Sequence, residues 1–173
     1  MRSKKCKFCK KQFTPERQMQ STCSFECAIE HSKVLKEAKI KKKKSDFRKN
    51  DKSVQKELAQ KVFNTYIRAR DKDLPCISCG EHTNRQMHAG HYFSQGGHTY
   101  LRFNTLNVHK QCSICNNWKS GNLAEYKENL IKKIGLGKYN WLDAHKHDST
   151  KHHDLEYYQR IIKIFRKKLK RIY

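Results

Sequence analysis

The chain has few acidic residues, few apolar residues and no long hydrophobic run. It contains 16 Asp and Glu against 39 Lys and Arg, so its formal net charge is +23. Apolar residues make up only 36% of its 173 residues, which is too little for one large core in a chain of this length. The absence of an apolar run of about 18 residues argues against a membrane-spanning helix. The excess of positive charge instead indicates a polyanionic partner, most often a nucleic acid.

The start of the chain also lacks the apolar stretch of a secretory signal peptide, because residues 1–11 are largely basic. The sequence contains neither a Gly/Ser-rich linker nor an internal repeat. We therefore expect an intracellular, cytoplasmic protein with no membrane partner. In such a reducing compartment, closely paired cysteines bind zinc more often than they form disulfides.

The eight cysteines fall into two sets, each made of two close pairs. Four thiolates in each set satisfy the tetrahedral preference of Zn²⁺, and the short spacing inside a pair lets both sulfurs reach one ion. We predict about two structural zinc ions per chain. Their ligands would be Cys6, Cys9, Cys23 and Cys27 in the first set, and Cys76, Cys79, Cys112 and Cys115 in the second. The first set would form a finger that contacts DNA, contacts a partner or caps the next helix.

The sequence predicts a small α+β protein in four parts. These are a four-cysteine zinc finger (1–32), a basic helical linker (33–70), a unit with the second cysteine set and several histidines (71–140), and a basic amphipathic C-terminal helix (141–173). The linker contains the run Lys41, Lys42, Lys43 and Lys44. Such a run is either a solvated face or a segment that follows a DNA backbone. The C-terminal helix is expected to dock on this chain or on a second copy.

Within residues 71–140 the predicted order is strand, loop, strand and helix. The first strand covers residues 86–93 and the second covers residues 106–110. The helix should open at Ser120-Gly121-Asn122 and end at Gly135.

Some further expectations concern single positions. Ser53 is a plausible N-cap for a helix that ends near Arg70. Both tryptophans, Trp118 and Trp141, should pack in the core. The polar stretch that carries His145, His147, His152 and His153 should be a solvated connector.

Several motifs of the third part resemble the HNH endonuclease motif, whose fold is called ββα-metal. They are Gly90-His91-Tyr92, Asn107, Cys112-Ser113-Ile114-Cys115-Asn116 and the following Lys119. More narrowly, the layout of residues 1–140 resembles the NinG (Rap) family of lambdoid phages. This resemblance implies a structure-specific DNA endonuclease that acts on branched recombination intermediates such as Holliday junctions and D-loops. It also implies recombination proteins as partners and the cytoplasm of the host cell as the location.

The resemblance assigns roles that suit phosphodiester hydrolysis, which needs a base to activate water and a cation to stabilise negative charge. His91 would be the general base, because an imidazole titrates near neutral pH. Asn107 would hold the loop or orient the His91 ring, and Asn116 would bind the catalytic metal through its amide oxygen. The metal would be Mg²⁺ or Mn²⁺. Arg102 and Lys119 would contact phosphate.

One position departs from the motif. Many HNH motifs have an Asp or His metal ligand directly before the base, but here that residue is Gly90. His88 is three residues from His91, so a β-bulge at Ala89-Gly90 would be needed to bring both side chains to one side. His88 is therefore one candidate for the missing ligand, and His109 is the alternative.

Three other functions are compatible with the sequence. A sequence-specific or nonspecific HNH nuclease would cut linear duplex DNA. A zinc-finger DNA-binding protein would bind without cutting, and a basic RNA-binding module would prefer RNA. Cutting both strands of a symmetric junction would suit a homodimer.

Overall fold

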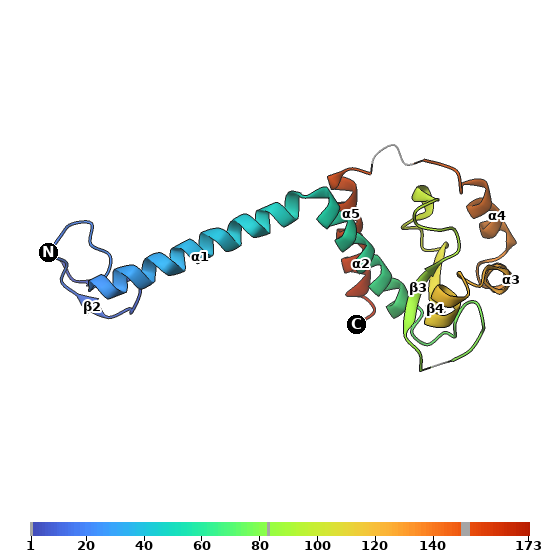
Figure 1. The fold of residues 1–173 in the computed structure, drawn as a ribbon, viewed down its shortest axis with the longest axis horizontal. Helices are drawn as coiled ribbons and strands as arrows, with labels where there is room; N and C mark the ends of the chain where they lie inside the picture. The colour runs from blue at the N-terminus through green and yellow to red at the C-terminus, as the bar shows by residue number, and fades with distance from the viewer. Residues whose placement is uncertain (1, 83, 150–152) are drawn as a thin grey trace. The chain divides into compact units, whose positions relative to one another are not determined.

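The computed structural model describes residues 2–82, 84–149 and 153–173 (Figure 1). The chain divides into two compact units, residues 1–50 and residues 51–173, here called the N-terminal and C-terminal units. The boundary falls inside the segment 33–70, for which the sequence predicted one basic helical linker. The division into four parts stays a prediction, and His152 of the expected connector lies outside the described residues.

The N-terminal unit consists of a small hairpin and one long helix. Strands β1 (Lys4–Lys5) and β2 (Gln12–Phe13) pair antiparallel, and helix α1 (Phe25–Asn50) follows. None of the α1 residues is buried. Successive residues of an α-helix are about 100° apart, so the four lysines from Lys41 to Lys44 point in four directions. A single DNA backbone could therefore meet only one or two of them.

The C-terminal unit begins with helix α2 (Lys52–Arg70), whose N-cap is Asp51 and not the predicted Ser53. The Asp51 carboxylate accepts a hydrogen bond of 2.8 Å from the Val54 N–H, which satisfies one of the free donors at the helix start.

Strands β3 (Met87–His91) and β4 (Val108–Cys112) then pair antiparallel. The short turns η1 (Thr99–Leu101) and η2 (Ile114–Trp118) follow β3 and β4 respectively, and helix α3 (Leu123–Ile134) ends at Gly135. The predicted order of strand, loop, strand and helix is therefore confirmed. Helices α4 (Leu136–Ala144) and α5 (Leu155–Leu169) complete the unit.

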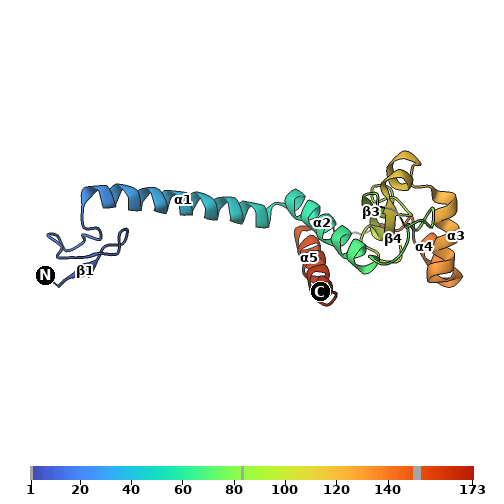
Figure 2. The same ribbon diagram turned by 90° about the horizontal axis from the view of Figure 1, so that it is seen from below.

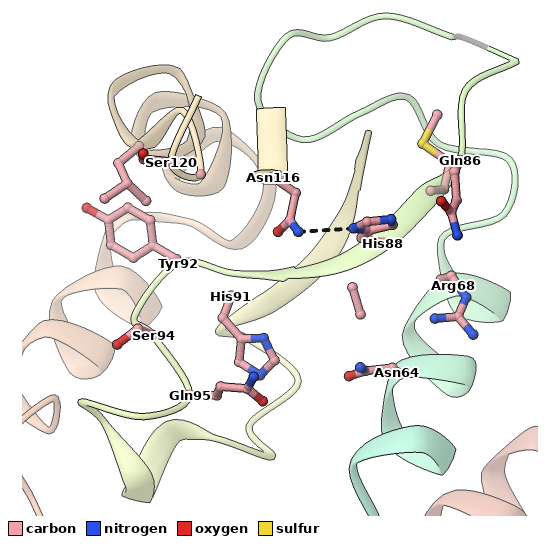
Figure 3. A pocket seen from close by; sticks show the side chains of 14 residues that line it. Asn64, Arg68, Gln86, His88, His91, Tyr92, Ser94, Gln95, Asn116 and Ser120 are labelled. Carbon is pink, nitrogen blue, oxygen red and sulfur yellow. Dashed lines mark hydrogen bonds between the residues drawn. The ribbon is translucent and has the colours of Figure 1, made fainter. Parts of the chain in front are cut away.

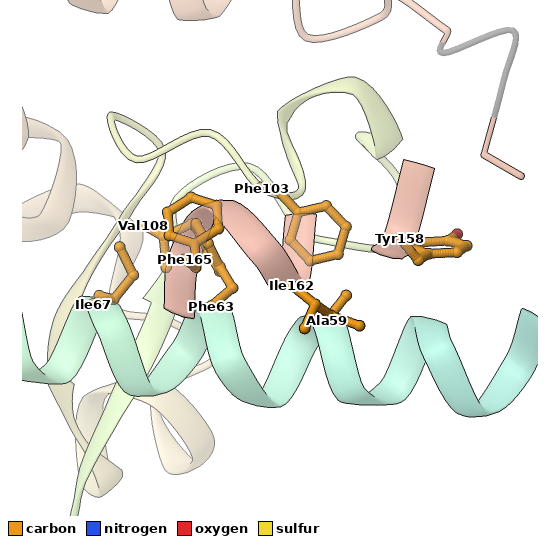
Figure 4. Packing of buried hydrophobic residues seen from close by; sticks show 8 residues of the cluster. All are labelled: Ala59, Phe63, Ile67, Phe103, Val108, Tyr158, Ile162 and Phe165. Atoms are coloured by element: carbon orange, nitrogen blue, oxygen red, sulfur yellow. The ribbon is translucent and has the colours of Figure 1, made fainter. Parts of the chain in front are cut away.

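Helix α5 lies along α2, as Figure 1 and Figure 2 both show. Between them lies an apolar cluster in which the Phe63 ring meets Phe103 and Phe165 edge to face, with ring centroids 5.5 and 4.8 Å apart (Figure 4). The full cluster consists of Ala59, Phe63, Ile67, Phe103, Val108, Tyr158, Ile162 and Phe165. The C-terminal helix was expected to dock either on this chain or on a second copy, and the structure confirms that it docks on this chain.

A second apolar cluster joins α3 and α4 to the sheet and is centred on Tyr126, Leu130 and Leu142, all fully buried. The two tryptophans take no part in either cluster. Trp118 exposes 84% of its surface and Trp141 exposes 39%, so the prediction that both pack in the core is wrong. Buried tyrosines of α3 and α4 fill this core instead.

A buried ionic network fixes the end of α2 to β4. The Asp71 carboxylate accepts hydrogen bonds from the Arg70 guanidinium at 2.9 and 2.7 Å and from the Lys110 N–H at 3.1 Å. Lys133 of α3 adds an ion pair of 3.3 Å. Burial raises the pKa of this carboxyl, but His109, Arg70 and Lys133 together hold it well below its usual range. The network therefore sets where the polar face of α2 lies beside the sheet.

None of the described helices is long and apolar enough to span a membrane.

Candidate functional site

The cysteine sets predicted from the sequence come together in space. In each set the four Sγ atoms lie within 4.8 Å of one another, and all eight cysteines are free thiols. Four sulfurs bound to one tetrahedral Zn²⁺ would lie roughly 3.8 Å apart, close to the 3.5 Å between Cys23 and Cys27 and the 4.0 Å between Cys79 and Cys112. Both clusters therefore fit a structural zinc ion.

In each cluster a backbone N–H group points at one sulfur and favours its thiolate. The Cys23 N–H donates to Cys6 Sγ at 3.4 Å, and the Cys112 N–H donates to Cys76 Sγ at 3.3 Å. Burial opposes ionisation of Cys6, but these hydrogen bonds outweigh it and lower its pKa to about 6. The pKa of Cys76 is lowered by the same kind of contact, again against burial. Thiolates are the form that binds a metal.

The second cluster also positions polar residues around β3. Cys112 ends β4 and Cys115 lies in η2, so the cluster holds η2 against the strand ends. The residue after Cys115 is Asn116, one of the predicted metal ligands. Its place beside β3 therefore depends on the cysteine cluster.

A pocket of about 730 Å³ runs along β3 (Figure 3), and we call it the β3 pocket. Its walls come from β3, from α2, from the loop after β3 and from the turn that contains Asn116 and Ser120. Three of the predicted site residues line it: His88, His91 and Asn116.

His88 and Asn116 are in direct contact. The Asn116 amide Nδ2 donates to His88 Nδ1 at 3.1 Å. In Figure 3, His88 points towards Asn116, whereas His91 lies towards Gln95 and Asn64. The structure thus brings together two of the three residues proposed from the sequence as metal ligands.

The β-bulge at Ala89-Gly90 that would bring His88 and His91 to one side of the strand is absent. β3 pairs with β4 in unbroken register, with Ala89 opposite Lys110 and Gly90 opposite His109. Both histidines nevertheless line the pocket, because it extends along the strand and not over a single face of the sheet.

Close packing against Gln111 explains why position 90 is a glycine. A Cβ atom added there would lie 2.9 Å from the Cβ of Gln111, well inside ordinary contact. Gln111 cannot move aside easily, because its Nε2 donates to Ser78 Oγ at 2.6 Å and to the Gly121 carbonyl at 2.5 Å. A larger residue at position 90 would therefore have to displace Gln111 or β3.

His91 is held in one tautomer. Its Nε2 lies 3.0 Å from the Arg102 carbonyl oxygen, which can only accept a hydrogen bond, so Nε2 carries the proton in the neutral ring. The lone pair is then on Nδ1. Burial lowers the pKa of His91 below its ordinary value, although backbone hydrogen bonds to Arg102 and Ala89 act in the opposite direction, so the ring is neutral at pH 7. A neutral, oriented imidazole is the form that a general base requires.

Asn107 is fully buried and does not line the β3 pocket. Its Oδ1 accepts from the Phe93 N–H at 2.8 Å, and its Nδ2 donates to the carbonyls of Phe93 and Leu101 at 2.9 and 3.2 Å. It therefore holds the loop between β3 and β4, which is the first of the two roles expected from the sequence.

His109 does not fit the role of an alternative metal ligand. It is 2% exposed, and both ring nitrogens have partners inside the protein. Nδ1 contacts the Arg70 guanidinium and Nε2 contacts the Leu106 carbonyl, each at 3.1 Å. Burial lowers its pKa, and the residue belongs to the Asp71 network, away from the pocket.

The sequence analysis did not identify two polar residues of α2, Asn64 and Arg68, as part of the site. Among the described residues that line the β3 pocket, Arg68 is the only Lys or Arg, and none is acidic. Arg68 and Asn64 lie on the polar face of α2. Three polar residues of α2 follow an i, i+4 spacing, Gln60, Asn64 and Arg68, directly beside the apolar series Ala59, Phe63 and Ile67. This pattern could have predicted from the sequence that α2 presents a polar face next to its buried face.

A second pocket of about 520 Å³ adjoins the first and shares Asn64, Arg68 and Gln95 with it. Lys56 and Lys61 of α2 line it, together with Arg102. The Arg102 Nε donates to Gln60 Oε1 at 2.8 Å, so this predicted phosphate contact is fixed to α2. Lys119 is exposed and lines neither pocket.

A family model described as "Bacteriophage Lambda NinG protein" matches residues 1–173. The chain is 54% identical over 77 residues to "Protein ninG" of Escherichia phage lambda and 48% identical over 86 residues to the protein of the same name from Salmonella phage P22. These segments cover 44% and 50% of the chain, but only 38% and 42% of the two relatives, less than half their length. No solved structure matches the chain. Because the family model matches the chain from residue 1 to residue 173, the chain belongs to the NinG protein family.

Proposed function

We propose that the protein is a metal-dependent endodeoxyribonuclease of the HNH type, with β3, β4, η2 and α3 as its ββα-metal unit. The observation that carries the proposal is the β3 pocket, which is lined by a neutral, oriented His91, by the His88–Asn116 pair and by one arginine. A phosphodiester is an anion that needs these three kinds of group for hydrolysis.

The ligand atoms available in the β3 pocket indicate which metal ion it would bind. His88 and Asn116 would hold it, and both are uncharged ligands. Mg²⁺ is usually bound through carboxylate oxygens, and no acidic side chain is among the described residues that line the pocket. A nitrogen ligand suits Mn²⁺ or another transition ion better. When bound, the ion would stabilise charge on the phosphate and the leaving oxygen.

His91 would take the proton from the attacking water on its Nδ1. The Arg102 carbonyl, which already accepts from Nε2, would stabilise the imidazolium that forms. The water oxygen bonds to phosphorus as the bond to the 3′ oxygen breaks, and that oxygen takes up a proton. Arg68 would bind a non-bridging phosphate oxygen and offset the growing charge. The products would carry 5′-phosphate and 3′-hydroxyl ends.

The basic residues of α2 extend this site. Lys56, Lys61 and Arg102 line the adjoining pocket, so the phosphates that flank the cleaved bond would follow α2. The net charge of +23 favours binding to any DNA. We propose that branched intermediates such as Holliday junctions and D-loops are the substrates, because separate arms can meet separate basic segments of one chain. A homodimer would cut both strands of a symmetric junction.

The test is a cleavage panel of junction, flap, D-loop and plain duplex of equal length, with Mg²⁺ or Mn²⁺. His91→Ala should lower cleavage by about 10²-fold or more and leave junction binding within a few-fold. Asn116→Ala should also lose activity and regain part of it at higher metal concentration. His82→Ala is the matched control, since His82 is exposed and lines neither pocket.

Cutting by His91→Ala at the wild-type rate would refute the assigned base. Binding without cutting under any cation would leave a zinc-stabilised DNA-binding protein. A preference for RNA in competition would indicate an RNA-binding module.

A further inference from the structure

Trp118 is a large apolar side chain left in solvent beside the β3 pocket. It lies in η2, between Asn116 and Ser120, which both line the pocket (Figure 3). It exposes 84% of its surface, and no ring contact between described residues involves it. The next residue, Lys119, is an exposed cation.

The backbone that carries Trp118 is fixed. The Lys119 N–H donates to the Ile114 carbonyl at 3.0 Å, and the Gly121 N–H donates to the Cys115 carbonyl at 2.9 Å. Ser120, Gly121 and Asn122 then follow with φ values of 48°, 92° and 47°. Two of them are not glycine, and a left-handed conformation costs such residues free energy.

Contacts to the cysteine cluster hold this turn in place. The Asn122 side chain donates to Cys115 Sγ at 3.7 Å, and the Gly121 carbonyl accepts from Gln111. The indole is therefore presented from a rigid turn, so a ligand that stacks on it would lose little conformational freedom of the protein.

We propose that Trp118 is a stacking platform for a nucleobase that a DNA branch leaves uncovered next to the cleaved phosphate. Inside a duplex both faces of every base are covered by neighbours. At a branch point, an unpaired base or a terminal pair has an open face, and an indole stacks on such a face regardless of sequence. Lys119 would bind the phosphate of the same nucleotide.

The inference rests on the proposed function for its substrate, and it adds Trp118 as the residue that would distinguish branched DNA from duplex DNA. The bare charge of the chain cannot make that choice, because phosphates occur along every DNA. Stacking on an aromatic side chain changes affinity by about 5- to 150-fold per base. This is the preference for branched DNA over duplex that Trp118 should supply.

The chain offers a direct readout, because Trp118 and Trp141 are its only tryptophans. Trp141 is stacked on His145 with ring centroids 4.3 Å apart. A Trp141→Phe variant reports Trp118 alone, and a Trp118→Phe variant reports Trp141 alone. Each zinc-loaded variant is titrated, without Mg²⁺ or Mn²⁺, with a forked DNA that has unpaired bases and with a relaxed, covalently closed circular duplex, which has neither unpaired bases nor a terminal pair.

The fork should quench the fluorescence of the Trp141→Phe variant and the duplex should not, while the Trp118→Phe variant responds to neither. Trp118→Ala should lower the ratio of fork affinity to duplex affinity by about 5- to 150-fold, and Trp141→Phe should leave it unchanged. Equal quenching by both DNAs, or none, overturns the inference. An emission shift that depends on protein concentration without DNA also overturns it, because a second copy then covers Trp118.

Failure of this inference and failure of the proposed function can be told apart. Fork-specific quenching in a protein that never cuts DNA would support the stacking platform and refute the proposed nuclease activity. Branch-specific cutting that survives Trp118→Ala unchanged supports the nuclease and removes the platform.

Discussion

Replacing Gly90 with alanine should destabilise the C-terminal unit, because the new methyl group has no room. Its Cβ would overlap the Gln111 Oε1 and lie 2.9 Å from both the Cβ and the Cδ of Gln111, so either β3 or the Gln111 side chain must move. A shift of the strand is an overpacking change, which typically costs about 1–3 kcal/mol. Movement of Gln111 would break its two hydrogen bonds to Ser78 and Gly121, at about 0.5–1.5 kcal/mol each. Both routes give a loss of about 1–3 kcal/mol.

The assay is thermal unfolding of the zinc-loaded protein followed by circular dichroism. For a unit of this size the loss corresponds to a Tm lowered by roughly 3–12 °C. Gly96→Ala is the matched control, because a Cβ at Gly96 meets nothing within 4 Å and its φ is not in the left-handed region. Gln111→Ala should reduce the additional effect of Gly90→Ala in a double-mutant cycle. A Tm for Gly90→Ala equal to that of Gly96→Ala would refute the close approach of Gly90 and Gln111.

Three further predictions concern the metal clusters, the ionic network and the base. Elemental analysis of protein purified without added metal should find about two Zn²⁺ per chain, and a value near zero would contradict the two-cluster architecture. Asp71→Asn should lower the free energy of unfolding by about 3–5 kcal/mol in a denaturant titration, because Arg70 and Lys133 lose their buried counter-charge; a loss below about 1 kcal/mol would mean that the network contributes little. Burial lowers the pKa of His91, and a base acts only when unprotonated, so cleavage should fall off on the acid side with a midpoint below pH 6.5. A midpoint above pH 7 would count against His91.

Residue spacing was enough to predict the parts of the site that depend on local sequence. The cysteine pairs, the strand with His88 and His91, and the placement of Asn116 directly after Cys115 all follow from short spacings. These features are short-range along the chain or belong to one four-cysteine cluster, so the sequence shows them directly.

Contacts between distant elements were not predictable in the same way. Arg68 reaches the pocket only because α2 packs beside β3. The network that fixes α2 joins Asp71 to Lys110 and Lys133, which are 39 and 62 positions further along the chain. The prediction for the two tryptophans was wrong because it relied only on residue type, which suggested burial. Which aromatic side chain fills a core depends on the volume between packed elements, and there Tyr126 and Tyr139 fit.

Helix α1 has a consequence for how this chain can change over generations. Its 26 residues include none that is buried, so the packing of a core does not fix the identity of its side chains. Substitutions that keep helix propensity and positive charge should therefore be nearly neutral for stability. Selection can still act in this segment on its length, about 1.5 Å per residue, and on its charge.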